Sequence, residues 1–328
     1  MEKIRIGIIG CGNLGRGVEM AVAQNPDMEL VGVFTRREPS AVCTVETKKI
    51  FPIKDVPLYK DKIDVMILCG GSATDLKQQS PQFAADFNIV DSFDTHAKIP
   101  EHFAAVNNAA SESGHVAIIS AGWDPGLFSI NRLIAEAVLP CGKSYTFWGC
   151  GLSQGHSDAV RRVNGVKHAV QYTIPVEEAI ARVRAGEKPN FTARDMHKRE
   201  CWVVAEENAD IEAIRMEIIN MPNYFAEYDT TVNFISEADF MANHKGMPHG
   251  GFVVRSGCTG ENLASANLIE FSLKLDSNPE FTASAIAAYA RAAFRMAAKG
   301  ECGAKTVFDV PPALLSPCSS EELRSRLL

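Results

Sequence analysis

Residues 4–15, IRIGIIGCGNLG, constrain the fold of this chain more than any other stretch. The run over residues 4–9 is short, rich in isoleucine and almost unbroken, as is typical of a parallel strand buried on both faces. A G-x-G-x-x-G motif follows at once, and the apolar residues after it recur at the spacing of the inner face of a helix. The pattern therefore predicts a buried strand, a tight glycine turn and a helix.

The three glycines of the motif suit the binding of a dinucleotide. Gly10 permits the tight turn that leaves the strand, and Gly12 lets a pyrophosphate approach the backbone. Gly15 lets the helix pack closely on the strand, and the helix N-terminus offers free N–H groups to the anion. The alternative is a glycine-rich turn in another kind of α/β protein, but the position between a strand and a helix favours a dinucleotide site.

The segment after the second expected strand, residues 29–34, indicates which dinucleotide binds. Enzymes that use NAD place an acidic residue about 20 residues beyond the glycine motif, where it binds the ribose 2′-OH. This chain has Thr35, Arg36 and Arg37 there, and the first acid is Glu38. Because guanidinium groups bind phosphate in a bidentate manner, we predict NADP rather than NAD. The alternative is that both arginines are solvated loop residues.

Three further buried strands are expected at residues 64–69, 87–91 and 115–120. Five strands alternating with helices predict a Rossmann-type, doubly wound parallel sheet. The loops after two of these strands carry Asp94 and Asp124. Each carboxylate could simply cap a turn, but such a sheet binds its ligand outside the carboxyl ends of its strands. That shared location favours a functional role for both.

The alternation ends after residue 126, and the rest of the chain predicts a second, α+β domain. Its expected strands are residues 144–148, 166–174, 200–205, 228–235 and 252–256, its expected helices are 127–139, 175–185 and 282–299, and residues 268–275 fit a strand or a short helix. We expect an irregular and then helical tail from Pro311 onward.

Two glycine-rich polar segments of this second half, residues 149–158 and 246–251, are interpreted as ligand loops. Trp148, beside the first loop, could belong to the core or to a wall of the substrate pocket. We place the dinucleotide-binding domain at residues 1–122 and a substrate-binding and dimerisation domain at residues 123–278. Residues 279–328 are expected to pack back on the first domain.

The composition argues against several other classes of protein. The chain has 33 basic and 40 acidic residues, and this net charge of −7 disfavours nucleic acid or a membrane surface as a general partner. Its nine cysteines are scattered without a C-x-x-C, and its histidines lack ligand spacing, so we expect neither disulfides nor a metal. No apolar run approaches the roughly 18 residues of a membrane span, and a strand begins too early for a signal peptide. We therefore expect a cytoplasmic protein.

With these motifs assembled, the chain resembles the meso-diaminopimelate dehydrogenase family. The matching segments are GCGNLGRGVE (10–19), CGGSATD (69–75), SAGWDPGLFSINR (120–132), TFWGCGLSQGHSDAVRR (146–162), HKRE (197–200), GMPHGG (246–251) and LKLDSNPEFTAS (273–284). They cover nearly the whole chain in the family's order, and WGCGLSQGHSDA is peculiar to it. The loop 255–267 diverges from the family pattern, and Cys11 and Cys150 replace other side chains at positions that need no particular one.

The resemblance implies a cytoplasmic homodimer that catalyses a reversible, NADP-dependent reaction of lysine biosynthesis. The reaction is oxidative deamination of meso-2,6-diaminopimelate at its D-centre. Its product is L-2-amino-6-oxopimelate, which cyclises to tetrahydrodipicolinate. The implied partners are therefore the small-molecule substrate, ammonium and a second copy of the chain, with no nucleic acid and no membrane.

The resemblance also implies the residues of both sites. The cofactor contacts fall on Gly10, Cys11, Gly12, Asn13, Leu14, Gly15, Thr35, Arg36, Arg37, Cys69, Gly70, Gly71, Ser72, Ser92, Phe93, Asp94, Ala121, Gly122, Trp123, Asp124 and Pro125. The substrate contacts fall on Asp94, Asp124, Trp148, Gln154, Gly155, Thr173, Arg199, His249 and Asn278.

The charges of the substrate divide these contacts into two groups. Asp94 and Asp124 would hold the ammonium at the reacting end, and Arg199, Thr173 and His249 would take the distal carboxylate. Gln154 and the Gly155 backbone would orient the reacting end, Trp148 would shape the pocket, and Asn278 would add a polar contact. Asp124 is the first candidate for positioning the water that attacks the imine, and Asp94 is the second.

Two other functions share parts of this pattern. An NADP-dependent reductase of a related semialdehyde or ring substrate would share the Rossmann half, but it does not need a pocket with two carboxylate–amine ends. A non-catalytic NADP-binding sensor would keep residues 10–15 and 35–37. It has no reason to keep Asp94, Asp124, Arg199 and His249 together.

Overall fold

The structure is a computed structural model that describes residues 3–45 and 49–328. The chain divides into two compact units. Unit 1 comprises Met1–Ile130 with Pro279–Leu328, and unit 2 comprises Asn131–Asn278.

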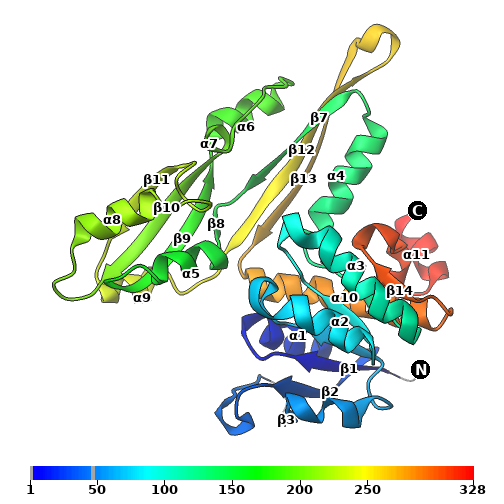
Figure 1. The fold of residues 1–328 in the computed structure, drawn as a ribbon. Coiled ribbons are helices and arrows are strands. Elements are labelled where there is room, and N and C mark those ends of the chain that lie inside the picture. Colours follow the sequence, from blue (N-terminus) through cyan, green and yellow to red (C-terminus); the bar gives the residue numbers. More distant parts are fainter. Residues whose placement is uncertain (1–2, 46–48) are drawn as a thin grey trace. The chain divides into compact units, whose positions relative to one another are not determined.

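Unit 1 contains a seven-stranded sheet in the order β14-β6-β5-β4-β1-β2-β3, whose neighbouring strands all run parallel (Figure 1). The strands are β1 (Ile4–Ile9), β2 (Met28–Thr35), β3 (Ile50–Pro52), β4 (Val65–Leu68), β5 (Asn88–Asp91), β6 (Val116–Ile118) and β14 (Gly303–Lys305). The predicted Rossmann-type parallel sheet is confirmed.

The helices of unit 1 cover both faces of this sheet. Along β4, Val65 and Ile67 pack into one hydrophobic core, and Met66 and Leu68 pack into another, because successive side chains of a strand point to opposite faces. The first core includes side chains of α1 (Asn13–Gln24) and α10 (Asn278–Ala297), and the second includes α2 (Lys77–Ala84) and α3 (Ile99–Ser113). The sheet is therefore doubly wound.

A buried ion pair joins the last part of the chain to the beginning of unit 1. The Arg291 side chain on α10 is 2% exposed, and its guanidinium donates to the two carboxylate oxygens of Asp27 at 2.6 and 2.7 Å. It also donates to Asn25 Oδ1 at 2.6 Å. The hydrogen bond from Arg291 holds the pKa of Asp27 below its usual value. The chain ends in α11 (Ser320–Leu327), after an irregular stretch with two short helical turns, as expected for the tail.

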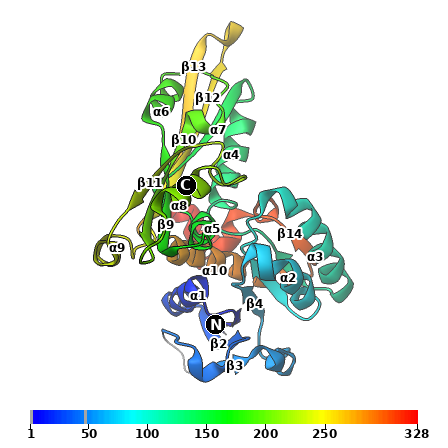
Figure 2. The same ribbon diagram turned by 60° about the vertical axis from the view of Figure 1, so that its left-hand side comes forward.

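Unit 2 contains two sheets, which Figure 2 shows from a second side. A four-stranded sheet has the order β11-β10-β9-β8, and a three-stranded sheet has the order β13-β12-β7. The strands are β7 (Gly142–Trp148), β8 (Gly151–Leu152), β9 (Val166–Pro175), β10 (His197–Ala205), β11 (Asp229–Phe234), β12 (His249–Thr259) and β13 (Ser265–Leu275). The helices are α4 (Leu127–Val138, which begins in unit 1), α5 (Gln154–Arg161), α6 (Glu177–Arg184), α7 (Ala193–Met196), α8 (Ile211–Ile219) and α9 (Glu237–Asn243).

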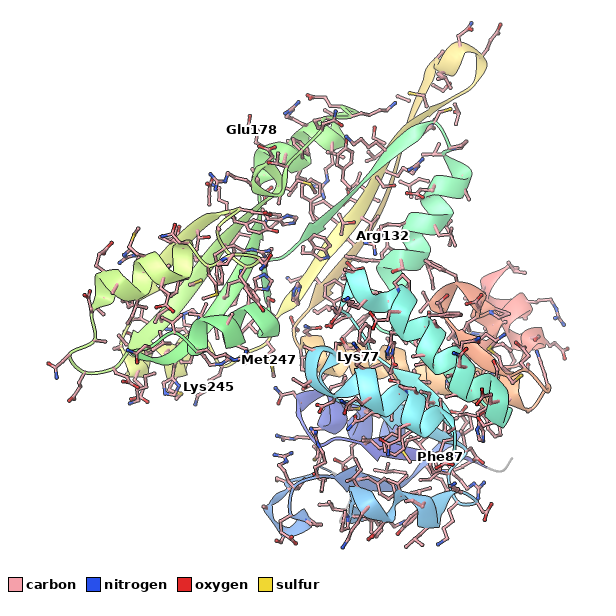
Figure 3. All side chains as sticks on the ribbon, in the orientation of Figure 1. Lys77, Phe87, Arg132, Glu178, Lys245 and Met247 are labelled. Carbon is pink, nitrogen blue, oxygen red and sulfur yellow. The ribbon has the colours of Figure 1, made fainter. Side chains whose placement is uncertain are left out.

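Short helical turns connect these elements. They are Pro39–Ala41, Ile53–Tyr59, Ser72–Leu76, His96–Lys98, Glu261–Leu263, Val307–Asp309 and Pro312–Leu315. In unit 2, Arg132 on α4 (Figure 3) donates to Thr146 Oγ1 on β7 at 3.1 Å. Buried Arg255 on β12 donates to Leu139 O just beyond α4 at 2.7 Å. These bonds hold α4 against the three-stranded sheet.

Most elements expected from the sequence are present, and the differences have local reasons. Residues 268–275, which fitted a strand or a short helix, belong to β13. The interpretation of residues 149–158 as one loop was wrong, because β8 covers Gly151–Leu152 and α5 begins at Gln154. The Ser153 side chain caps α5 by accepting from His156 N. The loop expected at residues 246–251 is shorter than predicted, because β12 begins at His249. The edge strands β3 and β14 were not expected. The segment Gly303–Lys305 has only one apolar residue, Ala304, which is too few to indicate a strand. It becomes a strand only by pairing with β6.

The glycine turn gives a test of this fold. A Cβ on Gly15 would lie 2.1 Å from Gly10 O, whereas a Cβ on Gly12 would meet no atom within 4 Å. We expect Gly15→Ala to lower the free energy of unfolding by about 1–3 kcal/mol, because α1 must move away from β1. Gly12→Ala should cost less than about 1 kcal/mol, the usual scale of an unfavourable N-cap residue. Urea unfolding of both variants measures this, and equal losses would contradict the packing role of Gly15.

Candidate active site

The turn between β1 and α1 presents unhindered backbone. Gly10 has a φ of +98°, a conformation that favours glycine, and its N–H donates to Phe34 O at 2.9 Å. Gly12 is the N-cap of α1 without a side-chain cap, and no acidic residue lies in the first turn. The space where a Gly12 side chain would project is open. Free N–H groups, a helix dipole and open space are what a pyrophosphate requires, so these residues fit a dinucleotide.

The residues predicted to select NADP lie beside this turn. Arg37 donates through Nη2 to Cys11 O at 2.5 Å, and its backbone N–H donates to Oγ1 of buried Thr35 at 3.1 Å. Arg36 is exposed and pairs with Asp75 across 2.7 Å. A cavity of about 440 Å³ lined by Arg36, Asp75 and Lys54, among others, adjoins this end of the sheet. Arg37 thus contacts the glycine turn. The exposed ion pair of Arg36 with Asp75 is weak enough to exchange for a phosphate.

The two predicted carboxylates follow neighbouring strands. Asp94 comes after β5, is exposed, and donates through its N–H to Ser72 Oγ at 3.0 Å, which joins it to the loop after β4. Asp124 comes after β6 and is half-buried. The Asp124–Pro125 peptide bond is cis, and the preceding Trp123 packs edge-on against Phe128 at 5.2 Å. Because β5 and β6 pair in parallel, both carboxylates lie at the ligand edge of the sheet.

In unit 2, a buried arginine is the centre of the predicted substrate residues. Arg199 on β10 lies opposite Thr173 on β9, and its Nη1 donates to Thr173 Oγ1. Its guanidinium lies 4.0 Å from the ring centre of Tyr228, and its buried Nε has no partner. Within the described part of the chain, Arg199 makes no ion pair, and burial lowers its pKa from the ordinary value. A buried cation without a carboxylate is costly, so this arrangement indicates an anion-binding site.

Two histidines that were not predicted lie near this cation. Burial, with Arg199 adding to it, lowers the pKa of both His156 and His197 to about 4. The Trp148 backbone N–H donates to His197 Nε2 at 2.9 Å, and the Trp148 ring stacks on His197 at 5.3 Å. Both imidazoles are therefore neutral at neutral pH, and the guanidinium is the positive charge of this cluster. A period-two pattern along HKRE, with His197 and Arg199 on one face, was a signal that could have revealed His197.

The other predicted substrate residues of unit 2 lie as follows. A Cβ on Gly151 would lie 2.4 Å from the His249 ring, and Gly151 pairs with Thr173, so His249 and Thr173 flank the same residue. The Gly250 N–H donates to His249 Nδ1 at 2.8 Å. Gly155 lies in the first turn of α5, and the side chain of Gln154 lies outside the described part of the structure. The Asn278 N–H donates to Met247 O at 2.9 Å.

Comparison with known proteins identifies the family. Residues 122–277 match the model of the diaminopimelic acid dehydrogenase C-terminal domain. The chain is 64% identical over 328 residues, all of both chains, to a meso-diaminopimelate D-dehydrogenase of Ureibacillus thermosphaericus. The chain belongs to the meso-diaminopimelate D-dehydrogenase family. It is therefore an oxidoreductase that uses a nicotinamide cofactor, as the resemblance predicted.

Two solved structures show how far this similarity extends. The Corynebacterium glutamicum DAP dehydrogenase in complex with DAP is 50% identical, with 100% of both chains covered and a TM-score of 0.93. An engineered D-amino acid dehydrogenase bound to NADP+ is 48% identical, with 99% of this chain and 100% of that chain covered and a TM-score of 0.88.

Two features are absent from the residues that the structure describes. No cluster of three or more histidine, cysteine or acidic side chains there could hold a metal ion. No helix there is long and apolar enough to cross a membrane.

The histidine cluster predicts a pH dependence of stability. In the unfolded chain His197 has a pKa of about 6.5, and in the folded chain its pKa is about 4. Between these two pH values the unfolded state therefore binds a proton that the folded state does not bind. Its contribution is complete above pH 6.5 and is lost as the pH falls towards 4, with a slope of up to about 1.4 kcal/mol per pH unit. His197→Gln, which can still accept from Trp148 N–H, should make urea-derived unfolding free energies depend less steeply on pH between 4.5 and 6.5. The remaining dependence would come in part from His156.

His96 is exposed in the loop before α3, so His96→Gln serves as the matched control and should keep the steep dependence. The role of His197 is wrong if His197→Gln unfolds with the same pH dependence as the unchanged chain.

Proposed function

We propose that this chain catalyses the reversible, NADP-dependent oxidative deamination of meso-2,6-diaminopimelate at its D-centre, within lysine biosynthesis. The product is L-2-amino-6-oxopimelate, which cyclises to tetrahydrodipicolinate. The observation that carries the proposal is the buried Arg199, paired with a hydroxyl and a ring instead of a carboxylate. It stands in a chain that matches named meso-diaminopimelate D-dehydrogenases from end to end.

The N-terminal turn and the loops after β2, β4, β5 and β6 would hold NADP. The free N–H groups at Gly12 suit the pyrophosphate, and Thr35, Arg36 and Arg37 suit a ribose 2′-phosphate. When bound, this cofactor supplies the acceptor for the hydride that leaves the substrate carbon. Support for the 2′-phosphorylated form also comes from the NADP+ bound to the engineered D-amino acid dehydrogenase.

The residues of unit 2 would bind the carboxylate far from the reacting carbon. Arg199 offers a permanent charge with a free Nε donor, and its geometry suits a bidentate carboxylate. Thr173 and His249 add polar contacts, Trp148 shapes the pocket, and Gln154, Gly155 and Asn278 complete the contacts. Because His156 and His197 are neutral, neither of them adds a second positive charge beside Arg199.

The carboxylates of unit 1 would hold the amine at the reacting carbon. Asp94 and Asp124 both favour the charged ammonium, which binds well but must lose a proton before the C–N bond becomes an imine. We propose that a base or bulk water accepts the proton that the substrate ammonium loses. Asp124 is the first candidate for orienting the water that attacks the imine, with Asp94 second. In this proposal, the residues of unit 2 bind the distal carboxylate, and the carboxylates of unit 1 serve the chemical step.

We further propose that the enzyme acts as a cytoplasmic homodimer. Leu133, Ile134 and Val138 on α4 are 49%, 53% and 61% exposed, and Leu268 on β13 is 42% exposed. Exposed apolar side chains gathered on one helix are typical of a surface that another chain covers. Their place in unit 2 agrees with the assignment of residues 123–278 to substrate binding and dimerisation.

The reaction itself is tested by following NADPH absorbance with separated diaminopimelate isomers. We expect turnover with meso-diaminopimelate and little with the LL isomer, because a site with buried polar groups discriminates strongly against a poorly matched substrate. The kcat/KM with NADP should exceed that with NAD by at least about tenfold, or roughly 1.4 kcal/mol. Turnover of a ring or semialdehyde substrate alone would support a related reductase, and NADP binding without any turnover would support a sensor.

Two buried arginines of unit 2 allow a matched test of the carboxylate site. Arg255 is 6% exposed, but its guanidinium donates to Leu139 O, Pro140 O and Ser144 Oγ. It also lies 3.7 Å from a carboxylate oxygen of Glu136. Arg199→Met should raise KM for meso-diaminopimelate by roughly 100-fold while stability stays equal or rises, because an unneutralised buried charge is removed.

Arg255→Met should lower stability by about 1–3 kcal/mol, because it leaves buried carbonyls unsatisfied, while KM changes little. Thermal melts and initial rates measure both properties. A normal KM in the Arg199→Met variant would show that another group binds the carboxylate.

A further inference from the structure

A buried carboxylate at the end of β5 has no part in the site described above. Asp91 ends the apolar strand Asn88–Asp91 and is 0% exposed. Burial of a carboxylate is costly unless its oxygens accept several hydrogen bonds. An apolar residue would suit this position in a parallel strand better, so the acid must have a local reason.

The hydrogen bonds of Asp91 join two loops of the sheet edge. Its Oδ1 accepts from the backbone N–H of Phe93 at 3.0 Å and from that of Ser120 at 2.8 Å. Its own carbonyl oxygen accepts from Ala121 N–H at 2.9 Å. We call residues 92–94 the Asp94 loop and residues 120–125 the Asp124 loop. One carboxylate oxygen therefore accepts from Phe93 of the Asp94 loop and from Ser120 of the Asp124 loop.

The backbone of the Asp124 loop needs this support. Ser120 has a φ of +55°, a left-handed conformation that costs a non-glycine residue on the order of 1–2 kcal/mol. Its N–H points to Asp91, and without that acceptor the strained turn would lose a hydrogen bond as well. Strain of this kind persists only where the surroundings fix the backbone, and such places cluster at functional sites.

Side chains of two helices, α2 and α3, contact the second carboxylate oxygen of Asp91. Oδ2 accepts from Ser80 Oγ on α2 at 2.6 Å and contacts His102 Nε2 on α3 at 2.8 Å. The His102 ring stacks on Phe93 with 4.0 Å between centres and 11° between planes. Phe93 directly precedes Asp94, so the same network immobilises the side chain next to that carboxylate. Side chains of α2 and α3 thus fix the Asp91 carboxylate, which in turn accepts hydrogen bonds from the backbone of two loops.

We propose that Asp91 is a positioning residue for the reaction, because its buried carboxylate fixes the Asp94 loop and the Asp124 loop relative to each other. The inference rests on the proposed function, which assigns both loops to the nicotinamide and the reacting amine. Hydride transfer requires near-contact geometry, and an error of about 1 Å can cost roughly 100-fold in rate. Asp91 contributes by holding Asp94 and Asp124 in place and touches no reacting atom itself.

The test compares Asp91→Asn with a variant of a carboxylate at the opposite end of the same sheet. Asp64 directly precedes β4 and accepts from Arg5 N, Nε and Nη2 at 2.8, 3.2 and 2.7 Å, so Asp64→Asn perturbs a comparable number of bonds. For both variants we would measure melting temperature, NADPH affinity, kcat and KM for meso-diaminopimelate, and the fluorescence spectrum of bound NADPH, which reports the surroundings of its nicotinamide.

We expect Asp91→Asn to lower kcat by 10- to 100-fold with less than threefold change in NADPH affinity, because Arg36, Arg37 and the glycine turn are untouched. The emission of bound NADPH should shift in this variant. Asp64→Asn should lower the melting temperature but keep kcat within about twofold and leave the emission unchanged. Should Asp91→Asn fail to fold, Ser80→Ala removes one donor to Oδ2, keeps both backbone bonds, and should lower kcat severalfold.

A normal kcat and an unshifted emission in Asp91→Asn, or in Ser80→Ala if only that variant folds, would overturn the role of Asp91. An equal loss of kcat in Asp64→Asn would overturn it too, since the effect would then follow stability. Failure of the unchanged enzyme to oxidise meso-diaminopimelate would overturn the proposed function instead, and the NADPH emission would still decide the question for Asp91.

Discussion

Parallel pairing of buried strands is the constraint on which the rest of unit 1 depends. Parallel strands need crossover helices, so their carboxyl ends all reach one edge and their loops meet there. Gly10, Thr35, Ser72, Asp94 and Asp124 are far apart in the sequence, but each lies at or after the carboxyl end of a strand of the same sheet. The edge therefore gathers anion-binding backbone, arginines and carboxylates without any of these residues being neighbours in the chain.

The treatment of charge differs between the two units. In unit 1, the buried side chains of Asp91 and Arg291 are engaged in hydrogen bonds, whereas the side chain of Asp94 is exposed. In unit 2, Arg255 donates to backbone carbonyls and pairs with Glu136, whereas Arg199 keeps a buried donor without an acceptor. A buried cation that keeps a donor without an acceptor is costly, which favours a ligand-binding role for Arg199. This contrast distinguishes structural from ligand-binding charges more clearly than burial alone.

Much of the candidate site could be predicted from local patterns, and the rest depended on contacts across the chain. The glycine motif and the arginines after β2 have fixed spacing, so the cofactor loops could be located from the sequence. His156 was hidden in a segment that we took for a loop, since α5 owes its start to a single capping serine. Asp91 looked like the last residue of an apolar strand, because nothing local shows that its acceptors lie on α2, α3 and the turn at Ser120.

The sequence by itself determined the parallel sheet, the dinucleotide turn and the resemblance to one family, because periodic apolar runs and fixed glycine spacings act over a few residues. Only the tertiary structure decided which charges are neutralised. Whether an arginine has a carboxylate beside it, or a histidine is driven neutral, depends on burial and on partners from distant strands. The stretch IRIGIIGCGNLG thus established where a nucleotide can bind, whereas the surroundings of Arg199 and Asp91 came from packing that no short segment encodes.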